Sequence, residues 1–537
     1  MTPLFPIAAL LGALALASAA SAAPPNFVFI LTDDQDILLN GTSAMPALHE
    51  HLVRGGTSFT GFVDVPVCCP SRTSTLTSRY SHNLNNTFLG WCGNYAKQHE
   101  NHTWIGLLKS AGYATGMFGK YFNDYSAFCG RNVHVPSDLS YVHLMCDDNL
   151  YFGNSFNVNG TMRTVGEDVY LTNVIGNSSL AWLAQQASAG GPFFAYIAPH
   201  APHVPATPAH EYENAPLPSE TAPRTPSWDY ATQHHHWLVS EKAPLTPALV
   251  TFSDQLHARR LRATMSVDDI VAAVFALLQD RGLLENTYVI YSSCAGPRAA
   301  GGRGVALQPA RALHLTLSRH LTRAPPDAAS DHGYDLGQFR LPSGKFHAFE
   351  NDIRVPFHVA GPGVTAGADL NTTLVNNVDI GATVLDLAGL GGAGYETDGR
   401  SFASQLSTAG RAARAWPRDR MLHEYWGLGY TERGPCKNGT SPCPGGVQAL
   451  EDAPSNSWSG LRILNTTHNL AYVEYRRGSG PDAPIEPAST NFTMLFDMQA
   501  DPWQLVNLAR NDSSAALVAA LHAELWQVAN CQGAACP

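Results

Sequence analysis

The sequence predicts an α/β fold built on a mainly parallel β-sheet, followed by a smaller C-terminal α+β domain. Four apolar runs have the length and composition of buried strands: residues 26–31, 114–118, 192–197 and 287–291. Helical patterns lie between them, at 104–111 and 267–280. Strands that alternate with helices are typical of a parallel sheet covered on both faces. A chain of 537 residues is too long for one small core, so two domains of unequal size are expected.

The helix expected at 267–280 has recognisable ends. Ser266 is placed as its N-cap, Asp269 follows three residues later, and Gly282 stands just past the last turn. Apolar side chains recur along it every three or four residues, which gives the helix one face for the core.

Each strand-like run leads into polar side chains. In chain order these are Asp33 and Asp34, then Lys120, then His200 and His203, then Asp331 and His332. The carboxyl ends of parallel strands meet at one edge of a sheet, and α/β proteins bind their ligands there. We therefore expect these side chains to line one pocket.

The chain divides after residue 414. Later strand-like runs are shorter, at 461–464, 469–475 and 493–497, and helical patterns are sparse. We expect a large domain over 23–414 and a smaller α+β domain over 415–537. Residues 294–330 break the pattern of the large domain, because they hold nine alanines, five arginines, one acid and no clear period. Such a long structureless loop suggests a retained intron or a gene-model error, and the alternative is a genuine surface insertion.

Several features indicate export. Residues 1–22 have the pattern of a secretory signal peptide, with an apolar run at 4–17 before small-residue cleavage motifs. Ten Asn-x-Ser/Thr sequons suit a glycoprotein, at Asn40, Asn85, Asn101, Asn159, Asn177, Asn371, Asn438, Asn465, Asn491 and Asn511. No later segment has the length of a membrane span. We expect a protein that is secreted to an extracellular, periplasmic or cell-wall location. A net charge of −11 argues against a nucleic-acid partner.

The segment from Cys68 to Arg79 fits the pattern C-x-P-S-R-x-x-x-L-T-[GS]-R. It resembles the signature of the formylglycine-dependent sulfatases, a family with an alkaline-phosphatase-like fold. The resemblance implies that a formylglycine-generating enzyme oxidises Cys68 to an aldehyde. One hydroxyl of the aldehyde hydrate would attack sulfur, and the other would allow sulfate to leave. The alternative is that Cys68 and Cys69 are structural thiols or disulfide partners.

Other segments extend the resemblance, at 25–35, 266–270, 333–342 and 352–356. They are similar to the branch that includes N-acetylglucosamine-6-sulfatase and some secreted arylsulfatases. In sulfatases the pieces that end at 293 and restart at 331 usually run together, which is why 294–330 is suspect. The family often has a histidine after Gly-Lys-Trp, and this chain has Tyr121 and Phe122 after Lys120, so Asn123 is the candidate replacement.

The resemblance also implies a metal site. Its ligands would be Asp33, Asp34, Asp331 and His332, with modified Cys68 facing the ion. Calcium suits the carboxylates, although the nitrogen of His332 suits a transition metal better.

The implied catalytic set is Cys68, Arg72, Lys120, His203 and Lys345. Arg72 and Lys120 would neutralise the aldehyde hydrate. Lys345 would contact the sulfate and His203 would give a proton to the leaving oxygen, where charge develops. His200 would shape the loop that carries His203.

Eight cysteines remain when Cys68 and Cys294 are set aside, an even number suited to disulfides in an oxidising compartment. Cys436 with Cys443 and Cys531 with Cys536 are possible bridges, and the connectivity stays open.

The leading hypothesis is a secreted arylsulfatase that hydrolyses sulfate esters to an alcohol or phenol plus sulfate. An N-acetylglucosamine-6-sulfatase that acts on sulfated glycans is the alternative within the family. A phosphatase or phosphodiesterase on the same scaffold would favour a Ser or Thr nucleophile and two transition metals. A non-catalytic glycan-binding glycoprotein becomes an option if the 294–330 segment displaces Asp331 and His332.

Overall fold

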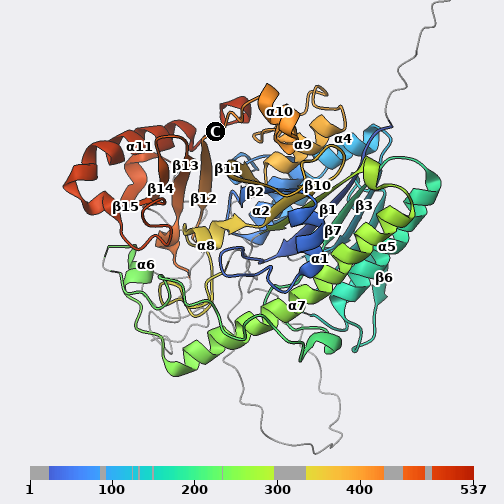
Figure 1. The fold of residues 1–537 in the computed structure, drawn as a ribbon, viewed down its shortest axis with the longest axis horizontal. Coiled ribbons are helices and arrows are strands. Elements are labelled where there is room, and N and C mark those ends of the chain that lie inside the picture. The colour runs from blue at the N-terminus through green and yellow to red at the C-terminus, as the bar shows by residue number, and fades with distance from the viewer. Residues whose placement is uncertain are drawn as a thin grey trace, which may run out of the picture.

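The computed structural model forms two β-sheets with helices around them (Figure 1). It describes residues 23–84, 92–123, 125–130, 133–147, 150–232, 234–294, 334–427, 452–477 and 486–537. The helices are α1 (Pro46–Leu48), α2 (Cys68–Thr77), α3 (Cys92–Gln98), α4 (Trp104–Ser110), α5 (Leu171–Ala189), α6 (Trp237–Ser240), α7 (Pro247–Asp280), α8 (Glu350–Ile353), α9 (Asp379–Leu387), α10 (Thr408–Ala413) and α11 (Ala515–Val528).

The large sheet has eleven strands in the order β11-β2-β10-β8-β1-β7-β3-β4-β5-β6, with β9 beside β2. Its strands are β1 (Asn26–Asp33), β2 (Thr57–Phe62), β3 (Ala114–Gly119), β4 (Tyr141–Met145), β5 (Ser155–Val158), β6 (Thr161–Thr164), β7 (Phe193–Ala198), β8 (Thr287–Cys294), β9 (Arg354–Val355), β10 (Phe357–Ala360) and β11 (Ala368–Asn376). From β8 through β1, β7 and β3 to β4 every pair is parallel. The predicted parallel sheet is thus confirmed at its centre, and the four predicted strands are β1, β3, β7 and β8.

Both faces of the large sheet are buried. Phe27, Phe29 and Leu31 of β1 lie in one core with side chains of α4 and α9. Val28 and Ile30 lie in a second core with side chains of α5 and α7. Figure 1 shows α5 and α7 on one side of the sheet and α4 and α9 on the other. Because both faces are covered, β1 reads as a continuous apolar run rather than an alternating one.

Helix α7 is longer than predicted. It begins at Pro247, and the Thr246 side chain caps it by accepting a hydrogen bond from Leu249 N. Ser266 is buried inside the helix, so its placement as an N-cap was wrong. The upstream turns bury Leu256 but also the charged Arg260, which hid the helical period from the sequence. The predicted end is confirmed, since Gly282 follows with φ +65°.

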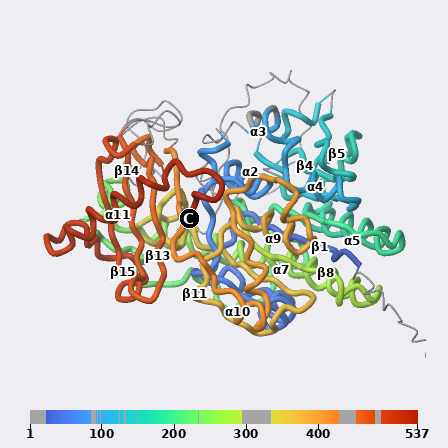
Figure 2. The backbone as a smooth tube through the Cα atoms, turned by 90° about the horizontal axis from the view of Figure 1, so that it is seen from above, coloured from blue at the N-terminus to red at the C-terminus, as the bar shows by residue number. Residues whose placement is uncertain are grey.

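The small sheet is antiparallel, in the order β12-β13-β14-β15. Its strands are β12 (Arg420–Tyr425), β13 (Trp458–Leu464), β14 (Asn469–Arg476) and β15 (Thr490–Asp497), and the last three contain the predicted runs. Leu521 and Leu525 of α11 pack on one face. The other face packs against Phe339, Phe346 and Phe349, which belong to the loops and α8 region of the large part. Figure 2 shows this sheet and α11 to one side of the large sheet.

Three disulfides join described cysteines: Cys69–Cys92, Cys129–Cys146 and Cys531–Cys536. The last of them confirms one predicted bridge. The other, Cys436–Cys443, lies outside the described residues, as does the suspect segment beyond Cys294. In the part of the chain that is described, no helix combines the length and apolar character that crossing a membrane requires.

A buried ion pair connects the two sheets. His82 lies in a 3₁₀ turn after α2, and its Nδ1 is 2.9 Å from the carboxylate of Glu424 on β12. Its Nε2 lies 2.8 Å from the carbonyl oxygen of Cys531. Burial lowers the pKa of His82, but Glu424 outweighs it and raises this pKa to about 9. His82 is therefore an imidazolium whose two N–H groups both donate to the C-terminal part.

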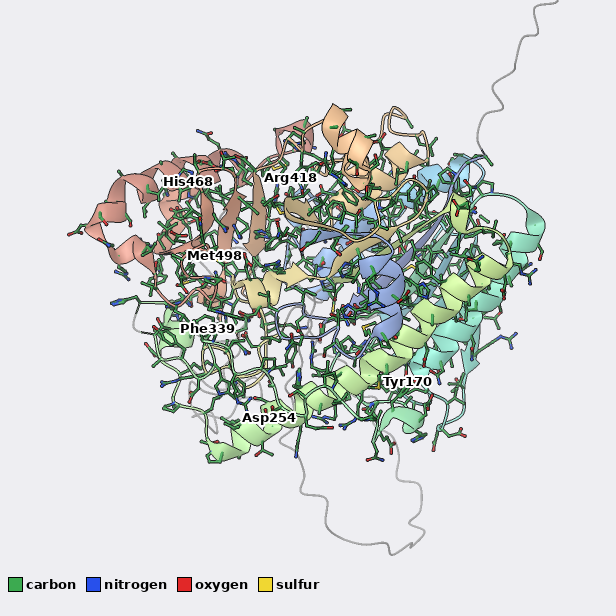
Figure 3. The ribbon with its side chains drawn as sticks, in the orientation of Figure 1. Tyr170, Asp254, Phe339, Arg418, His468 and Met498 are labelled. Carbon is green, nitrogen blue, oxygen red and sulfur yellow. A yellow bond between two sulfur atoms is a disulfide. The ribbon has the colours of Figure 1, made fainter. Side chains whose placement is uncertain are left out.

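His82 should make stability depend on pH. Its folded-state pKa, about 9, lies above the ordinary value of 6.5, so its contribution is complete below pH 6.5 and is lost as pH rises through 9. His82→Gln should remove this part of the pH dependence of the free energy of unfolding, up to about 3 kcal/mol. Urea unfolding of both proteins from pH 6 to 10 would measure it. His468→Gln, at the exposed site labelled in Figure 3, is the control. A His82→Gln protein with the wild-type slope would contradict the prediction.

Candidate functional site

Separate segments converge at the carboxyl edge of the large sheet. The residues they bring there are Asp33 at the end of β1 and Asp34 after it, Lys120 after β3, His200 and His203 after β7, and Cys68 at the start of α2. Strand β7 pairs in parallel with both β1 and β3, so the three carboxyl ends lie side by side. The pocket expected from the strand ends is therefore present.

Asp33 is the centre of this cluster. Its Oδ2 lies 2.7 Å from Lys120 Nζ and 3.1 Å from His200 Nδ1. Its Oδ1 lies 3.2 Å from an Arg72 guanidinium nitrogen and 3.5 Å from Cys68 Sγ. Burial raises the pKa of Asp33, but Lys120 and Arg72 outweigh it and hold this pKa well below the ordinary value. Asp33 is thus a carboxylate shared by two cations.

Lys120 connects Asp33 to the cysteine. Its Nζ lies 3.1 Å from Cys68 Sγ, and its carbonyl oxygen accepts a hydrogen bond of 2.9 Å from Arg72. The residue before it is a glycine for a physical reason: Gly119 has φ +91°, and a Cβ there would lie 2.1 Å from Ala198 O. This close approach lets Lys120 N donate to Ala198 O at 2.8 Å. The Gly-Lys pair therefore fixes the lysine beside Cys68 Sγ.

Asp34 is buried in a strained conformation. Its φ is +73°, in the left-handed region that few residues other than glycine adopt. Its Oδ1 lies 3.4 Å from Lys345 Nζ, and among the described residues its Oδ2 has no hydrogen-bond partner. Burial and the charge of Asp33 raise the pKa of Asp34 well above its ordinary value. A buried carboxylate with an unsatisfied oxygen is costly, and a bound cation would remove that cost.

Arg260 supports Asp34 from behind. It lies on α7, donates to the backbone carbonyl of Asp34 and lies 3.0 Å from Asp36 Oδ1. Its guanidinium also stacks 4.2 Å from the centre of the Tyr334 ring. The sequence interpretation missed this residue. The only signal was the Arg259-Arg260 pair thirteen residues into a helix whose start had been placed too late.

His200 and His203 form a stacked pair above Asp33. Their ring centres are 4.3 Å apart, and the Tyr151 hydroxyl donates to the carbonyl oxygen of His203 at 2.5 Å. Burial, His200 and Lys120 lower the pKa of His203 well below its ordinary value. One ligand atom each of Asp33, Cys68 and His203 lie within 4.8 Å of one another, a spacing that could hold a metal ion. The sequence placed His203 only as a proton donor.

The structure thus places seven predicted site residues in one region: Asp33, Asp34, Cys68, Arg72, Lys120, His203 and Lys345. Asp331 and His332 lie outside the described residues, so their assignment as metal ligands stays a prediction. Asn123 is buried four residues after Gly119, and its role also stays a prediction.

Comparisons with known proteins agree with this geometry. The model of the Sulfatase family matches residues 25–316 and 328–390, more than half of the chain. The chain belongs to the sulfatase family. The match is interrupted at 317–327, inside the segment that the sequence marked as suspect. This membership confirms that the protein is a sulfate ester hydrolase and disfavours the phosphatase alternative.

Curated relatives of this sulfatase carry different names. N-acetylglucosamine-6-sulfatase of Capra hircus is 33% identical over 95% of this chain and 84% of its own length. Arylsulfatase of Volvox carteri is 29% identical over 98% of this chain and 78% of its own. An extracellular sulfatase SULF-1 homolog of Drosophila melanogaster is 32% identical over 73% of this chain and 32% of its own.

Solved structures show the same fold. A protein in complex with its substrate D-glucosamine-2-N,6-O-disulfate has a TM-score of 0.63 and 17% identity, over 94% of this sulfatase and 97% of that protein. The predicted alkaline-phosphatase-like α/β architecture is confirmed.

Sulfatases generally use a formylglycine and a divalent metal ion, and the residues of this sulfatase fit both. Cys68 lies at the first position of α2 in contact with Lys120, and none of the three disulfides uses it. Among the described residues, the buried Oδ2 of Asp34 has no hydrogen-bond partner, so it could act as a metal ligand. Carboxylate oxygens are the ligands that hard divalent cations prefer.

Arg260→Gln should weaken metal binding. The substitution removes the donor to the Asp34 carbonyl and the partner of Asp36, so Asp34 should lose its fixed orientation. Loss of such a supporting contact typically reduces metal affinity or activity about 10–100-fold. The change in metal affinity would be measured by titrating metal-depleted enzyme with calcium and recording sulfatase activity at each calcium concentration. Arg262→Gln is the matched control, because Arg262 on the same helix pairs with exposed Glu220. Equal calcium affinity in both variants would contradict the role of Arg260.

Proposed function

We propose that this sulfatase cleaves sulfate esters with modified residue 68 as the nucleophile. Asp33, Arg72 and Lys120 would hold this nucleophile in place. The observation that carries the proposal is the contact set around Cys68 Sγ, which lies 3.1 Å from Lys120 Nζ and 3.5 Å from Asp33 Oδ1. In the mature enzyme the sulfur would be replaced by formylglycine oxygen, so these contacts mark where the oxygen would lie. When present, the hydrated aldehyde supplies one hydroxyl to attack sulfur and a second that lets sulfate leave.

Arg72 and Lys120 would stabilise negative charge on the nucleophile. Both cations are buried, so solvent screens them little. Asp33 accepts a hydrogen bond from Lys120 and forms an ion pair with Arg72 at 3.2 Å, so it fixes both positions. Preorganised charges of this kind cost no reorganisation during the reaction.

Lys345 and His203 would act on the substrate side. Lys345 Nζ lies beside Asp34, where it could donate to a sulfate oxygen. His203 would give its proton to the leaving oxygen. Burial beside His200 and Lys120 favours the neutral imidazole, and a bound sulfate, being negatively charged, would act in the opposite direction.

A divalent cation, for which calcium is our candidate, would neutralise the two buried aspartates and the sulfate oxygens. Asp33 and Asp34 would hold it from the described part of the site, with Asp331, His332 and the modified Cys68. The carboxylate chemistry supports this assignment, as does Asp34 Oδ2, which has no hydrogen-bond partner in the part of the chain that the structure describes.

Aryl sulfates are the first proposed substrate class. The similarity to the Volvox carteri arylsulfatase, which extends over 98% of this chain, supports this class. Sulfated N-acetylglucosamine is the second candidate, because the relative with that activity is the more identical of the two. The signal-like leader, the disulfides and the extracellular relative support secretion, so the maturing chain would meet a formylglycine-generating enzyme on that route.

Cys68→Ala should abolish sulfatase activity. The expected loss in kcat is at least about 10³-fold, since no hydroxyl remains to attack sulfur. Cys68→Ser is the matched variant: it offers one hydroxyl without the second, so it should be sulfated once and fail to turn over. Mass spectrometry of the peptide from wild-type enzyme should show an aldehyde at position 68. Activity within a few-fold of wild type in Cys68→Ala, or only unmodified thiol in active enzyme, would refute the assigned nucleophile.

Comparison of two substrates should identify the substrate class. An aryl sulfate releases a phenol, a better leaving group than a sugar hydroxyl, so an arylsulfatase should show the higher kcat/KM on it. A sugar sulfatase would recover the difference through binding energy from the sugar. Parallel kinetics with 4-nitrophenyl sulfate and N-acetylglucosamine-6-sulfate would test this. A higher kcat/KM on the sugar would favour the second candidate.

A further inference from the structure

A cavity of about 350 Å³ lies at the seam between the two sheets. Its walls come from β2 and β11 of the large sheet, from α8 and β9, and from β13, β14 and the turn after β15. The lining residues are Thr60, Glu350, Arg354, Asn371, Thr372, Arg462, Leu464, Asn469, Met498 and Pro502. Met498, labelled in Figure 3, lies beside α8 in that view. The cavity belongs to neither the Cys68 site nor any function assigned above, and its volume lies in the range of small-molecule sites.

The sequon at Asn371 opens onto this cavity. Strand β11 pairs with β2 at Leu370 opposite Phe59 and at Leu374 opposite Thr60, so residues 371–373 bulge out of the ladder. These three residues are Asn-Thr-Thr, a complete sequon. The Thr60 hydroxyl donates to the carbonyl oxygen of Asn371 at 2.9 Å and fixes the bulge. Asn371 is exposed while it lines the cavity, so a group attached to its amide would start at the cavity wall.

We propose that Asn371 carries an N-linked glycan whose first N-acetylglucosamine units lie in this cavity. The proposal rests on secretion, because attachment requires the secretory route. It adds a modification site and an internal glycan-binding site to the sulfatase, independent of its catalytic chemistry.

The lining suits an uncharged sugar. Leu464, Met498 and Pro502 offer apolar surface for one face of a pyranose ring. Among the described residues, the Asn469 side-chain oxygen is buried without a hydrogen-bond partner, and a sugar hydroxyl or N-acetyl N–H would satisfy it.

The charged groups of the lining are paired with one another. Glu350 accepts from Arg462 Nε at 2.5 Å and from Arg354 at 3.2 Å. Two guanidinium groups against one carboxylate leave an excess of donors, which sugar hydroxyl oxygens can accept from. A docked glycan would therefore bridge the large sheet, where it is attached, and the small sheet, which supplies Arg462 and Asn469.

Enzymatic release of the glycans from folded protein would test the proposal. Peptide-N-glycosidase converts each released asparagine to aspartate, which mass spectrometry counts site by site. Asn177, exposed on α5, is the internal reference sequon. We expect Asn371 to be glycosylated and its glycan to be released about tenfold more slowly than that of Asn177, a difference of about 1.4 kcal/mol. After denaturation the two rates should become equal.

Asn469→Ala should abolish the protection at Asn371 and leave Asn177 unchanged. Gln499→Ala, which changes an exposed neighbour of Met498, is the matched control and should keep the protection. An empty Asn371 in protein with a glycosylated Asn177 would overturn the inference and leave secretion intact. Equal release rates in folded wild type, or protection that survives Asn469→Ala, would also overturn it. Protein without glycan at any sequon would also overturn this inference, whereas sulfatase activity is tested separately.

Discussion

The site depends on the burial of one carboxylate, Asp33. A fully buried charge is costly unless opposite charges and hydrogen bonds compensate it. Asp33 has Lys120, Arg72 and His200 around it, and Lys120 also contacts Cys68. Each partner comes from a different segment of the chain. The contacts that compensate the charge of Asp33 therefore connect the ends of β1, β3 and β7 to the start of α2. A change in any one of these segments would alter the surroundings of residue 68.

The large sheet provides this convergence because both of its faces are covered. Its central strands are anchored in two cores, so their carboxyl ends are fixed relative to one another. The long helix α7 adds a contribution from outside the sheet, since Arg260 holds the carbonyl of Asp34 in its left-handed conformation. Asp33 is held through its side chain and Asp34 through its backbone, so the two adjacent carboxylates have different supports and different pKa shifts.

The small sheet contacts the segments that carry the site residues. One of its faces packs on the loops that follow the active-site segment, including Phe346 next to Lys345. The His82–Glu424 ion pair attaches its first strand to the turn after α2. The cavity that Asn371 borders lies along the same seam. The C-terminal part therefore contacts both the turn after α2 and the loop that carries Lys345.

The sequence alone determined the strands and the sulfatase assignment, and it predicted Cys68 as the nucleophile. Buried strands appear as apolar runs whatever their partners, and the Cys68–Arg79 signature is contiguous, so neither needs tertiary information. Only the tertiary structure decided what depends on distant contacts. The true start of α7 was hidden because the buried Arg260 interrupts its apolar period, and Arg260 itself was missed for the same reason. Likewise ten sequons look alike in the sequence, and the fold alone places Asn371 on a cavity wall. A local sequence pattern reflects whether a residue is buried. A role that depends on contacts with residues far along the chain does not appear in that pattern.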